Sequence, residues 1–274
     1  MLIFFFNKIY KYDLLVKTEI GNVFMEYAIL IDVTKCIGCR SCQVSCKRWN
    51  DLPGESTTQK SDWTNPPKLS YTTYTHIRFN LEYDESSDAT AWRFLNWRCM
   101  HCKNPACLDA CPVDAIVKTN EGAVVIKEDR CIGCKYCISA CPFEIPQYDL
   151  ETEKVSKCHM CFDRIPTKEP TCVQGCPTDA LYFDERSKIL EMAAQRKAEI
   201  NGYIYGDLDN KPLGGTSFIY VADVDLKSLG IPEVGEKTSL AIPAMVNAKL
   251  LLVPAVAGGL LYLTAWRKKR MEGK

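Results

Sequence analysis

The sequence predicts an α+β fold of two small cysteine-rich units, one nested inside the other, with an inserted β-hairpin and one C-terminal transmembrane helix. Three observations support this prediction. Sixteen cysteines form four groups with a repeated spacing. Two segments rich in aromatic and β-branched residues separate the first two groups, and a long uncharged stretch lies near the C-terminus.

The two inner cysteine groups are adjacent in the chain. Cys131–Pro142 has the spacing C-x2-C-x2-C-x3-C-P, by which bacterial ferredoxins hold iron–sulfur clusters. Cys99–Pro112 repeats it with two residues added between the second and third cysteines. Three cysteines of one tight loop bind one cluster, while the fourth, followed by proline, binds the neighbouring cluster. The predicted inner ligand sets are Cys99, Cys102, Cys107 and Cys141, and Cys111, Cys131, Cys134 and Cys137.

The two outer groups have the same spacing with two departures. Lys47 replaces the trailing proline of the first group, and residues 162–171 separate the second and third cysteines of the last. Because the inner groups complete one another, the outer groups are expected to pair across the whole domain. The predicted outer ligand sets are Cys36, Cys39, Cys42 and Cys176, and Cys46, Cys158, Cys161 and Cys172.

This pairing predicts two nested ferredoxin-like units within residues 27–186. The predicted parts are an outer unit of residues 27–50 and 155–186, an inner unit of residues 97–150, and an insert of residues 51–96. Within the inner unit, residues 114–126 are typical of a short β-hairpin.

Composition limits the other possibilities. Lys+Arg and Asp+Glu both number 34, which gives no indication of a nucleic-acid surface. Disulfide bridges are one alternative for the cysteines, but they do not require four groups with this spacing. Structural zinc on the C-x2-C pairs is another, and it leaves the third cysteines and the trailing prolines unexplained.

His101 and His159 lie inside C-x2-C loops, where histidine could replace a cysteine ligand. Because all sixteen cysteines already form four complete sets, both histidines are expected to lie beside a cluster and to influence it by hydrogen bonding. No remaining group of side chains resembles a nucleophile or an acid–base pair. The sequence therefore predicts a chain that carries electrons and has no catalytic residues.

Other elements surround the cysteine groups. Residues 71–81 and 89–98 predict a hairpin whose aromatic side chains belong to a core or an interface. An extension, residues 187–240, contains a predicted amphipathic helix at 187–200 and a strand at 216–222. Residues 1–26 are expected to be an N-terminal extension, with translation starting at Met1 or Met25.

A membrane anchor and basic tail are predicted at residues 241–274. Leu250–Trp266 is an uncharged run long enough for a transmembrane helix, with a buried or surface-lying helix as the alternative. It ends at Arg267–Arg270, which by the positive-inside rule places the C-terminus in the cytoplasm and the cysteine-rich domain on the outer, periplasmic face of the inner membrane. Because residues 1–24 contain no twin-arginine motif, export as a complex with a signal-bearing partner is expected.

Several motifs together resemble the iron–sulfur β subunits of molybdopterin oxidoreductases. The C-terminal helix and Gly214–Thr216 are most similar to membrane-bound respiratory formate dehydrogenase. The resemblance implies four [4Fe-4S] clusters, relaying electrons from a molybdenum- or tungsten-pterin catalytic α subunit to a cytochrome b γ subunit and quinone. A relay subunit of a membrane hydrogenase or a sulfur-compound reductase is the alternative, and a zinc-stabilised membrane scaffold is another. The motifs are Cys36–Gln43, Arg98–Cys102, Cys131–Cys137 and Cys141–Phe143.

Overall fold

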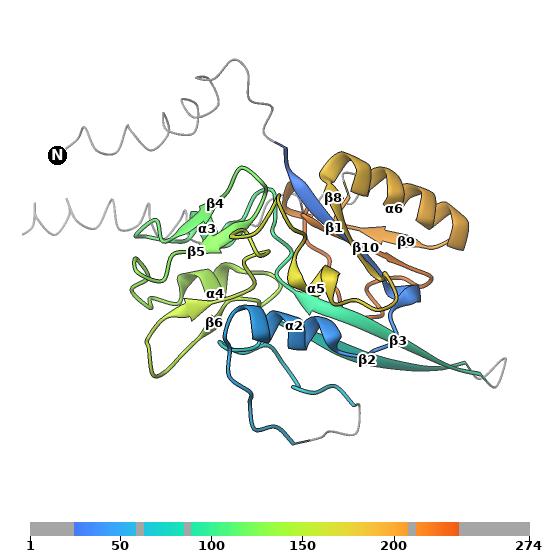
Figure 1. Ribbon diagram of the computed structural model, residues 1–274, viewed down its shortest axis with the longest axis horizontal. Helices are drawn as coiled ribbons and strands as arrows, with labels where there is room; N and C mark the ends of the chain where they lie inside the picture. Colours follow the sequence, from blue (N-terminus) through green and yellow to red (C-terminus); the bar gives the residue numbers. More distant parts are fainter. Residues whose placement is uncertain (1–24, 59–62, 85–88, 208–211, 236–274) are drawn as a thin grey trace, which may run out of the picture.

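The computed structural model describes residues 25–58, 63–84, 89–207 and 212–235. Its largest sheet has four strands in the order β8-β1-β10-β9 (Figure 1). β1 pairs in parallel with β10 and antiparallel with β8, while β9 pairs antiparallel with β10. The strand bounds are β8 Leu181–Glu185, β1 Tyr27–Asp32, β10 Phe218–Ala222 and β9 Tyr203–Tyr205.

The two faces of this sheet have different roles. Because side chains alternate along a strand, Ala28 and Leu30 of β1 lie on one face and Ile29 and Ile31 on the other. The first face packs against α6 (Arg186–Ile200), which lies along the sheet in Figure 1. The second face belongs to a core that includes several of the cysteines. The sheet therefore forms a wall of the cysteine-rich region.

The predicted extension belongs to the same sheet as the outer unit. β10, from the extension, lies between β1 and β9, and all of its residues are buried. A strand buried on both faces is apolar throughout, as Phe218–Ala222 is, and needs neighbours on both edges. Strands β9 and β10 thus complete the sheet that β1 and β8 begin.

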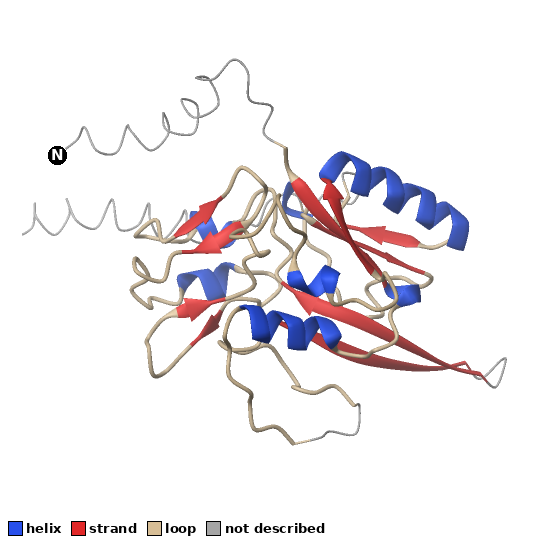
Figure 2. Ribbon diagram, in the orientation of Figure 1, coloured by secondary structure: helices blue, strands red, loops and turns tan. Residues whose placement is uncertain are grey.

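Four short helices lie in the cysteine-rich region, among long loops (Figure 2). Each carries the third cysteine of its group. Helix α2 packs against α5, and α3 packs against α4, so the outer helices meet each other and the inner helices meet each other. The bounds are α2 Ser41–Trp49, α3 Ala106–Asp109, α4 Tyr136–Ala140 and α5 Thr171–Gln174.

The length of α2 follows from the missing proline. In the third group, Cys141 precedes Pro142, has an extended backbone and ends α4. In the first group Lys47 stands in the proline position, and α2 continues through Cys46 to Trp49. The fourth cysteine of that group therefore lies on a helix.

Three two-stranded hairpins complete the described structure. The predicted hairpin at residues 71–98 is present as β2 (Thr75–Asp84) and β3 (Ala89–Arg98). The predicted inner hairpin is present as β4 (Ile116–Lys118) and β5 (Val124–Ile126). The third, β6 (Gln147–Tyr148) with β7 (Val155–Ser156), was not predicted, because two-residue strands give no periodic signal. Two 3₁₀ turns are η1 (Val33–Lys35) and η2 (Pro212–Gly214).

The predicted membrane anchor, residues 241–274, lies outside the described residues, as do residues 1–24. Within the described ranges, none of the helices has the length and apolar character needed to span a bilayer.

Candidate iron–sulfur centres

All sixteen cysteines are free thiols, and ten of them are buried. No disulfide joins any two of them, so the structure gives the disulfide alternative no support. Among the described residues, no three Cys, His, Asp or Glu side chains are grouped closely enough to hold a single metal ion. The electrostatic interactions among the cysteines indicate which of them are neighbours.

Two outer sets bring together cysteines from the two ends of the domain. We call Cys36, Cys39, Cys42 and Cys176 set A, and Cys46, Cys158, Cys161 and Cys172 set B. Burial, and then the negative charges of Cys176 and Cys39, raise the pKa of Cys36 to about 11. Burial together with Cys158, Cys172 and Cys161 raises the pKa of Cys46 well above its usual range. Cys46 is thus close enough to Cys158, Cys172 and Cys161 to interact with them electrostatically.

The inner sets show the same crossing. We call Cys99, Cys102, Cys107 and Cys141 set C, and Cys111, Cys131, Cys134 and Cys137 set D. Burial and the charges of Cys99, Cys107 and Cys141 raise the pKa of Cys102. Burial and the charges of Cys134, Cys131 and Cys111 raise the pKa of Cys137 to about 12. The four cysteines of set D also line one small cavity.

Electrostatic interactions between cysteines of different sets give the sets one order. Cys172 of set B acts on Cys42 of set A, and Cys99 of set C acts on Cys158 of set B. Cys137 of set D acts on Cys107 of set C. The four sets are therefore neighbours in the order A, B, C, D, although the groups that supply three cysteines to each set follow one another along the chain in the order A, C, D, B.

The C-I-G-C loops of sets A and D have the same backbone conformation. Gly38 and Gly133 have φ values of +68° and +67°. The residue before each helix, Arg40 or Lys135, is also left-handed, with φ values of 62° and 64°. A Cβ on Gly133 would lie 2.3 Å from the carbonyl oxygen of Glu153, so only glycine fits there.

Arg98 tests whether the cysteines can hold a cluster. It is 1% exposed, and its Nη1 donates a hydrogen bond to the Cys172 Sγ at 2.9 Å. No carboxylate among the described residues pairs with it. Burial disfavours its charge, but the negative charges of Cys172, Cys158 and Cys42 outweigh this and raise the pKa of Arg98.

A buried guanidinium needs negative charge beside it. Cysteines supply that charge only as thiolates, and burial raises the pKa of Cys42 and Cys158 to about 12. Metal coordination deprotonates such thiols. The donor set around Arg98 therefore fits an iron–sulfur cluster, which is built on four thiolates.

A second buried cation, Lys157, lies near sets B and C. Lys157 is 5% exposed, and its Nζ donates hydrogen bonds to the carbonyl oxygens of Cys158, at 3.1 Å, and Val124. Burial lowers its pKa, but the charges of Cys99, Cys107 and Cys158 outweigh this and raise it. Lys157 therefore lies between sets B and C.

Sequence reasoning did not identify Arg98, Lys157 or Asn96 as functional. The Nδ2 of Asn96 donates to the Cys42 Sγ at 3.0 Å, and its Oδ1 accepts from Arg98 Nε at 2.6 Å. A signal for the two cations was present, since a basic residue directly precedes the first cysteine of every group: Lys35, Arg98, Arg130 and Lys157. Only the structure shows that Arg98 and Lys157 are buried while Lys35 and Arg130 are exposed.

The two loop histidines form hydrogen bonds with residues outside their own C-x2-C loops. His101 is fully buried, and its Nδ1 accepts a hydrogen bond from the Val124 amide at 2.8 Å. Burial and nearby cations lower its pKa well below the usual range, so the neutral ring carries its proton on Nε2. His159 Nε2 is hydrogen bonded to Asn50, whose Nδ2 lies 3.5 Å from the Cys46 Sγ.

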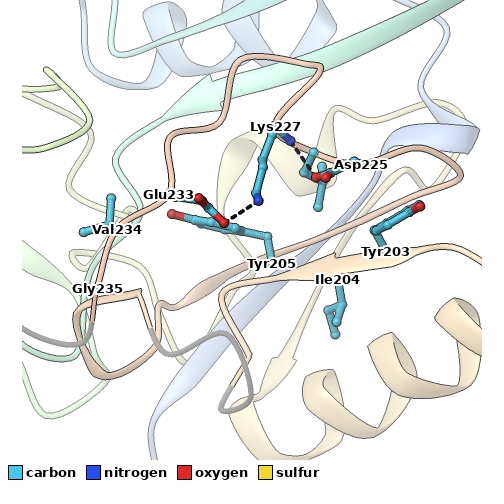
Figure 3. A pocket seen from close by; sticks show the side chains of 9 residues that line it. Tyr203, Ile204, Tyr205, Asp225, Lys227, Glu233, Val234 and Gly235 are labelled. Carbon is cyan, nitrogen blue, oxygen red and sulfur yellow. Dashed lines mark hydrogen bonds and ion pairs between the residues drawn. The ribbon is translucent and has the colours of Figure 1, made fainter.

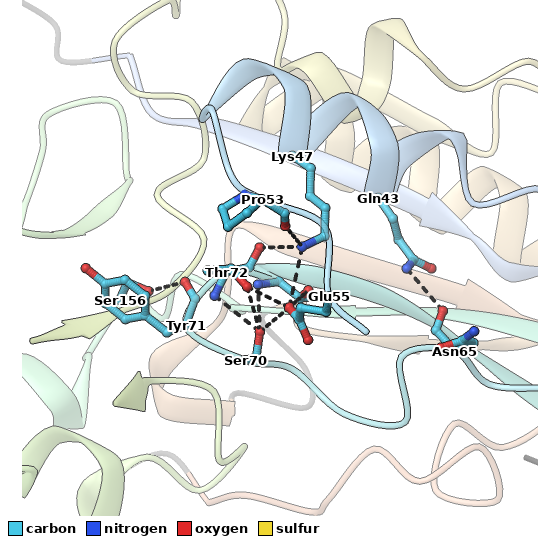
Figure 4. Close-up of polar contacts among 10 residues, drawn as sticks. Gln43, Lys47, Pro53, Glu55, Asn65, Ser70, Tyr71, Thr72 and Ser156 are labelled. Atoms are coloured by element: carbon cyan, nitrogen blue, oxygen red, sulfur yellow. Dashed lines mark hydrogen bonds and ion pairs between the residues drawn. The ribbon is translucent and has the colours of Figure 1, made fainter. Parts of the chain in front are cut away.

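Lys47 holds the insert against α2 (Figure 4). Its Nζ donates to the carbonyl oxygens of Pro53, at 2.9 Å, and Thr72, at 2.8 Å, and lies 3.4 Å from Glu55 Oε1. The same Glu55 oxygen accepts hydrogen bonds from three hydroxyls: Ser70, Thr72 and Thr73. The residue that replaces the trailing proline therefore anchors the loop that follows Cys46.

A cavity of about 460 Å³ lies beside β9 (Figure 3). It is lined by Tyr203 and Tyr205 and by the ion pair of Lys227 with Glu233. No cysteine or histidine lines it. None of the predicted cluster ligands therefore lines this cavity.

Comparison with known proteins agrees with this chemistry. Residues 35–115 and 90–186 each match the family described as 4Fe-4S dicluster domain. The chain is 41% identical to the iron–sulfur subunit of nitrate-inducible formate dehydrogenase of Escherichia coli (strain K12) over 209 residues, 74% of this chain and 70% of that protein.

Two further relatives share most of the domain. The chain is 38% identical to the formate dehydrogenase 2 subunit beta (cytochrome c-553) of Nitratidesulfovibrio vulgaris, over 64% of this chain and 84% of that protein. It is 36% identical to a probable anaerobic dimethyl sulfoxide reductase chain of Escherichia coli, over 58% and 73%. These matches confirm the resemblance seen in the motifs: the chain belongs to the family of formate dehydrogenase iron–sulfur subunits and carries 4Fe-4S dicluster domains.

Proposed function

We propose that this chain is the electron-transfer subunit of a formate dehydrogenase complex, with one [4Fe-4S] cluster on each of sets A to D. The observation that carries the proposal is the order A, B, C, D in which cysteines of neighbouring sets interact electrostatically. This order connects the four sets into one continuous path. Bound clusters would supply one-electron redox chemistry. The cysteines would hold the clusters as successive neighbours, and the buried strands β1 and β10 would exclude water on that side.

The ends of the path are the proposed points of electron exchange. Cys39 of set A and Cys134 of set D are the two exposed cysteines. Each follows an exposed isoleucine in its loop, Ile37 at 58% and Ile132 at 62%. Exposed apolar side chains suit a protein interface. One end would face a molybdopterin catalytic α subunit and the other a membrane cytochrome b γ subunit.

The first experiment measures metal and electron flow. The purified chain should contain close to sixteen irons and as many acid-labile sulfides, four for each set. In the complex, formate should reduce these clusters, as seen by electron paramagnetic resonance. A preparation with zinc and no sulfide would support the zinc-scaffold alternative and contradict the proposal.

A relay subunit of a sulfur-compound reductase is the second candidate. It is favoured by the 36% identity to a probable anaerobic dimethyl sulfoxide reductase chain. The two candidates differ in the direction of electron flow. In the complex purified from its natural source, formate should reduce the clusters if the first is correct, whereas dimethyl sulfoxide should oxidise reduced clusters if the second is.

The membrane arrangement is part of the proposal. Leu250–Trp266 would span the inner membrane, with Arg267–Arg270 in the cytoplasm and the cluster domain on the outer face. With the partner present, protease added outside the inner membrane should cut within residues 51–67 and leave the tail intact. Cleavage only from the cytoplasmic side would contradict this orientation.

A further inference from the structure

Each cysteine group begins with the same pair, a basic residue followed by a cysteine. The pair differs between the ends and the middle of the path. Lys35 and Arg130, which precede the first cysteines of the terminal sets A and D, are exposed. Arg98 and Lys157, which precede the first cysteines of the central sets C and B, are buried.

Each of the two buried cations precedes a cysteine of one central set and lies near the other central set. Arg98 precedes Cys99 of set C, yet its Nη1 donates to the Cys172 Sγ of set B at 2.9 Å. Lys157 precedes Cys158 of set B, yet its Nζ donates to the carbonyl oxygen of Val124, whose amide is hydrogen bonded to His101 in the loop of set C. The charges of Cys99 and Cys107 in set C also act on Lys157. Each central set therefore receives a cation from the loop of the other.

No carboxylate neutralises either cation. Among the residues that the structure describes, Arg98 contacts Asn96, Cys172 and the face of Phe218, and its Nη2 has no partner. The Nζ of Lys157 contacts two carbonyl oxygens. Their positive charges therefore act mainly on the cysteines of the central sets, and Arg98 also acts on Cys42 of set A.

We propose that Arg98 and Lys157 are potential-setting residues, which raise the reduction potentials of the two central clusters above those of the terminal clusters. This inference rests on the proposed function. Reduction adds one negative charge to a cluster, and a buried cation stabilises that charge more than an exposed cation does, because solvent screens the exposed one. Hydrogen bonding to a ligand sulfur acts in the same direction.

The test is redox titration of the full chain, followed by electron paramagnetic resonance, with each signal assigned by a cysteine substitution in one set. R98Q should lower the potential of the set B cluster, and K157Q that of the set C cluster. We expect at least a tenfold change in the ratio of reduced to oxidised cluster, which is 59 mV for one electron. K35Q and R130Q, at the equivalent exposed positions, are the matched controls and should leave all four potentials unchanged.

R98K and K157R keep the charge and should restore the potentials. If a glutamine variant loses its cluster, retention of that cluster at the wild-type potential in the conservative variant still supports the proposal. Loss in both variants, unchanged potentials in R98Q and K157Q, or equal shifts in the controls would overturn it. Wild-type chain without iron would instead refute the proposed function, since that result does not depend on the variants.

Discussion

The loop around Gly133 requires a left-handed backbone conformation at this residue, and the substitution G133A should disrupt the loop. Gly133 has a φ of +67°, which costs a non-glycine residue about 1–2 kcal/mol. The new Cβ would also lie 2.3 Å from the Glu153 carbonyl oxygen, so the backbone of residue 153 must move. We expect the free energy of unfolding to fall by at least about 2 kcal/mol, which lowers the melting temperature by roughly 4–8 °C.

Two other glycines provide graded controls. A Cβ on Gly38 would meet the ring of Phe94 at 2.8 Å, and a side chain can shift where a backbone cannot. A Cβ on Gly54 would have nothing within 4 Å. Thermal melting is monitored by cluster absorbance, and the iron content per chain is measured. The loss of stability and of iron should be largest in G133A, smaller in G38A and smallest in G54A. If G133A melted and retained iron like G54A, the described loop geometry would be wrong.

Three further predictions concern the insert and the anchor. K47M removes hydrogen bonds to Pro53 and Thr72, so proteolysis within residues 51–58 should accelerate; an unchanged rate would contradict the anchoring role. Burial opposes the charge of Glu55, but hydroxyl hydrogen bonds and Lys47 lower its pKa, so E55Q should be less stable than wild type at pH 7. In urea unfolding, that difference should disappear as the pH falls through the lowered pKa, and a constant difference would refute it. Deleting residues 241–274 should release the chain from membranes, and continued membrane association would disprove the anchor.

Spacing predicted the cysteine sets because a fixed loop length determines which thiols can converge. Two of the three hairpins, β2–β3 and β4–β5, and the helix α6 were also predicted, since their residues have periods of two and 3.6. The position of β10 was not predicted, because strand order within a sheet leaves no local trace in the sequence. The extension was expected as a separate segment, whereas β10 fills the centre of the sheet beside β1.

Burial of a charged residue is equally hard to predict. Lys35 and Lys157 both precede the first cysteine of a group, but β1 and η1 lead Lys35 to the surface, while Lys157 follows β7 into the core. The role of Lys47 was missed for a related reason. The sequence shows that Lys47 replaces the trailing proline. It does not show that the insert folds back and brings Pro53 and Thr72 to Lys47.

The most direct test of the central claim is the effect of C46S on cluster spectra, alone and combined with serine substitutions in sets A and B. Set B should lose its cluster in C46S and in C158S, and the double variant C46S/C158S should lose no more, about four of sixteen irons. C46S combined with C36S should lose two clusters, because Cys36 belongs to set A. If C46S and C36S removed the same cluster while C46S and C158S were additive, the crossed sets would be contradicted and each outer group would hold its own cluster.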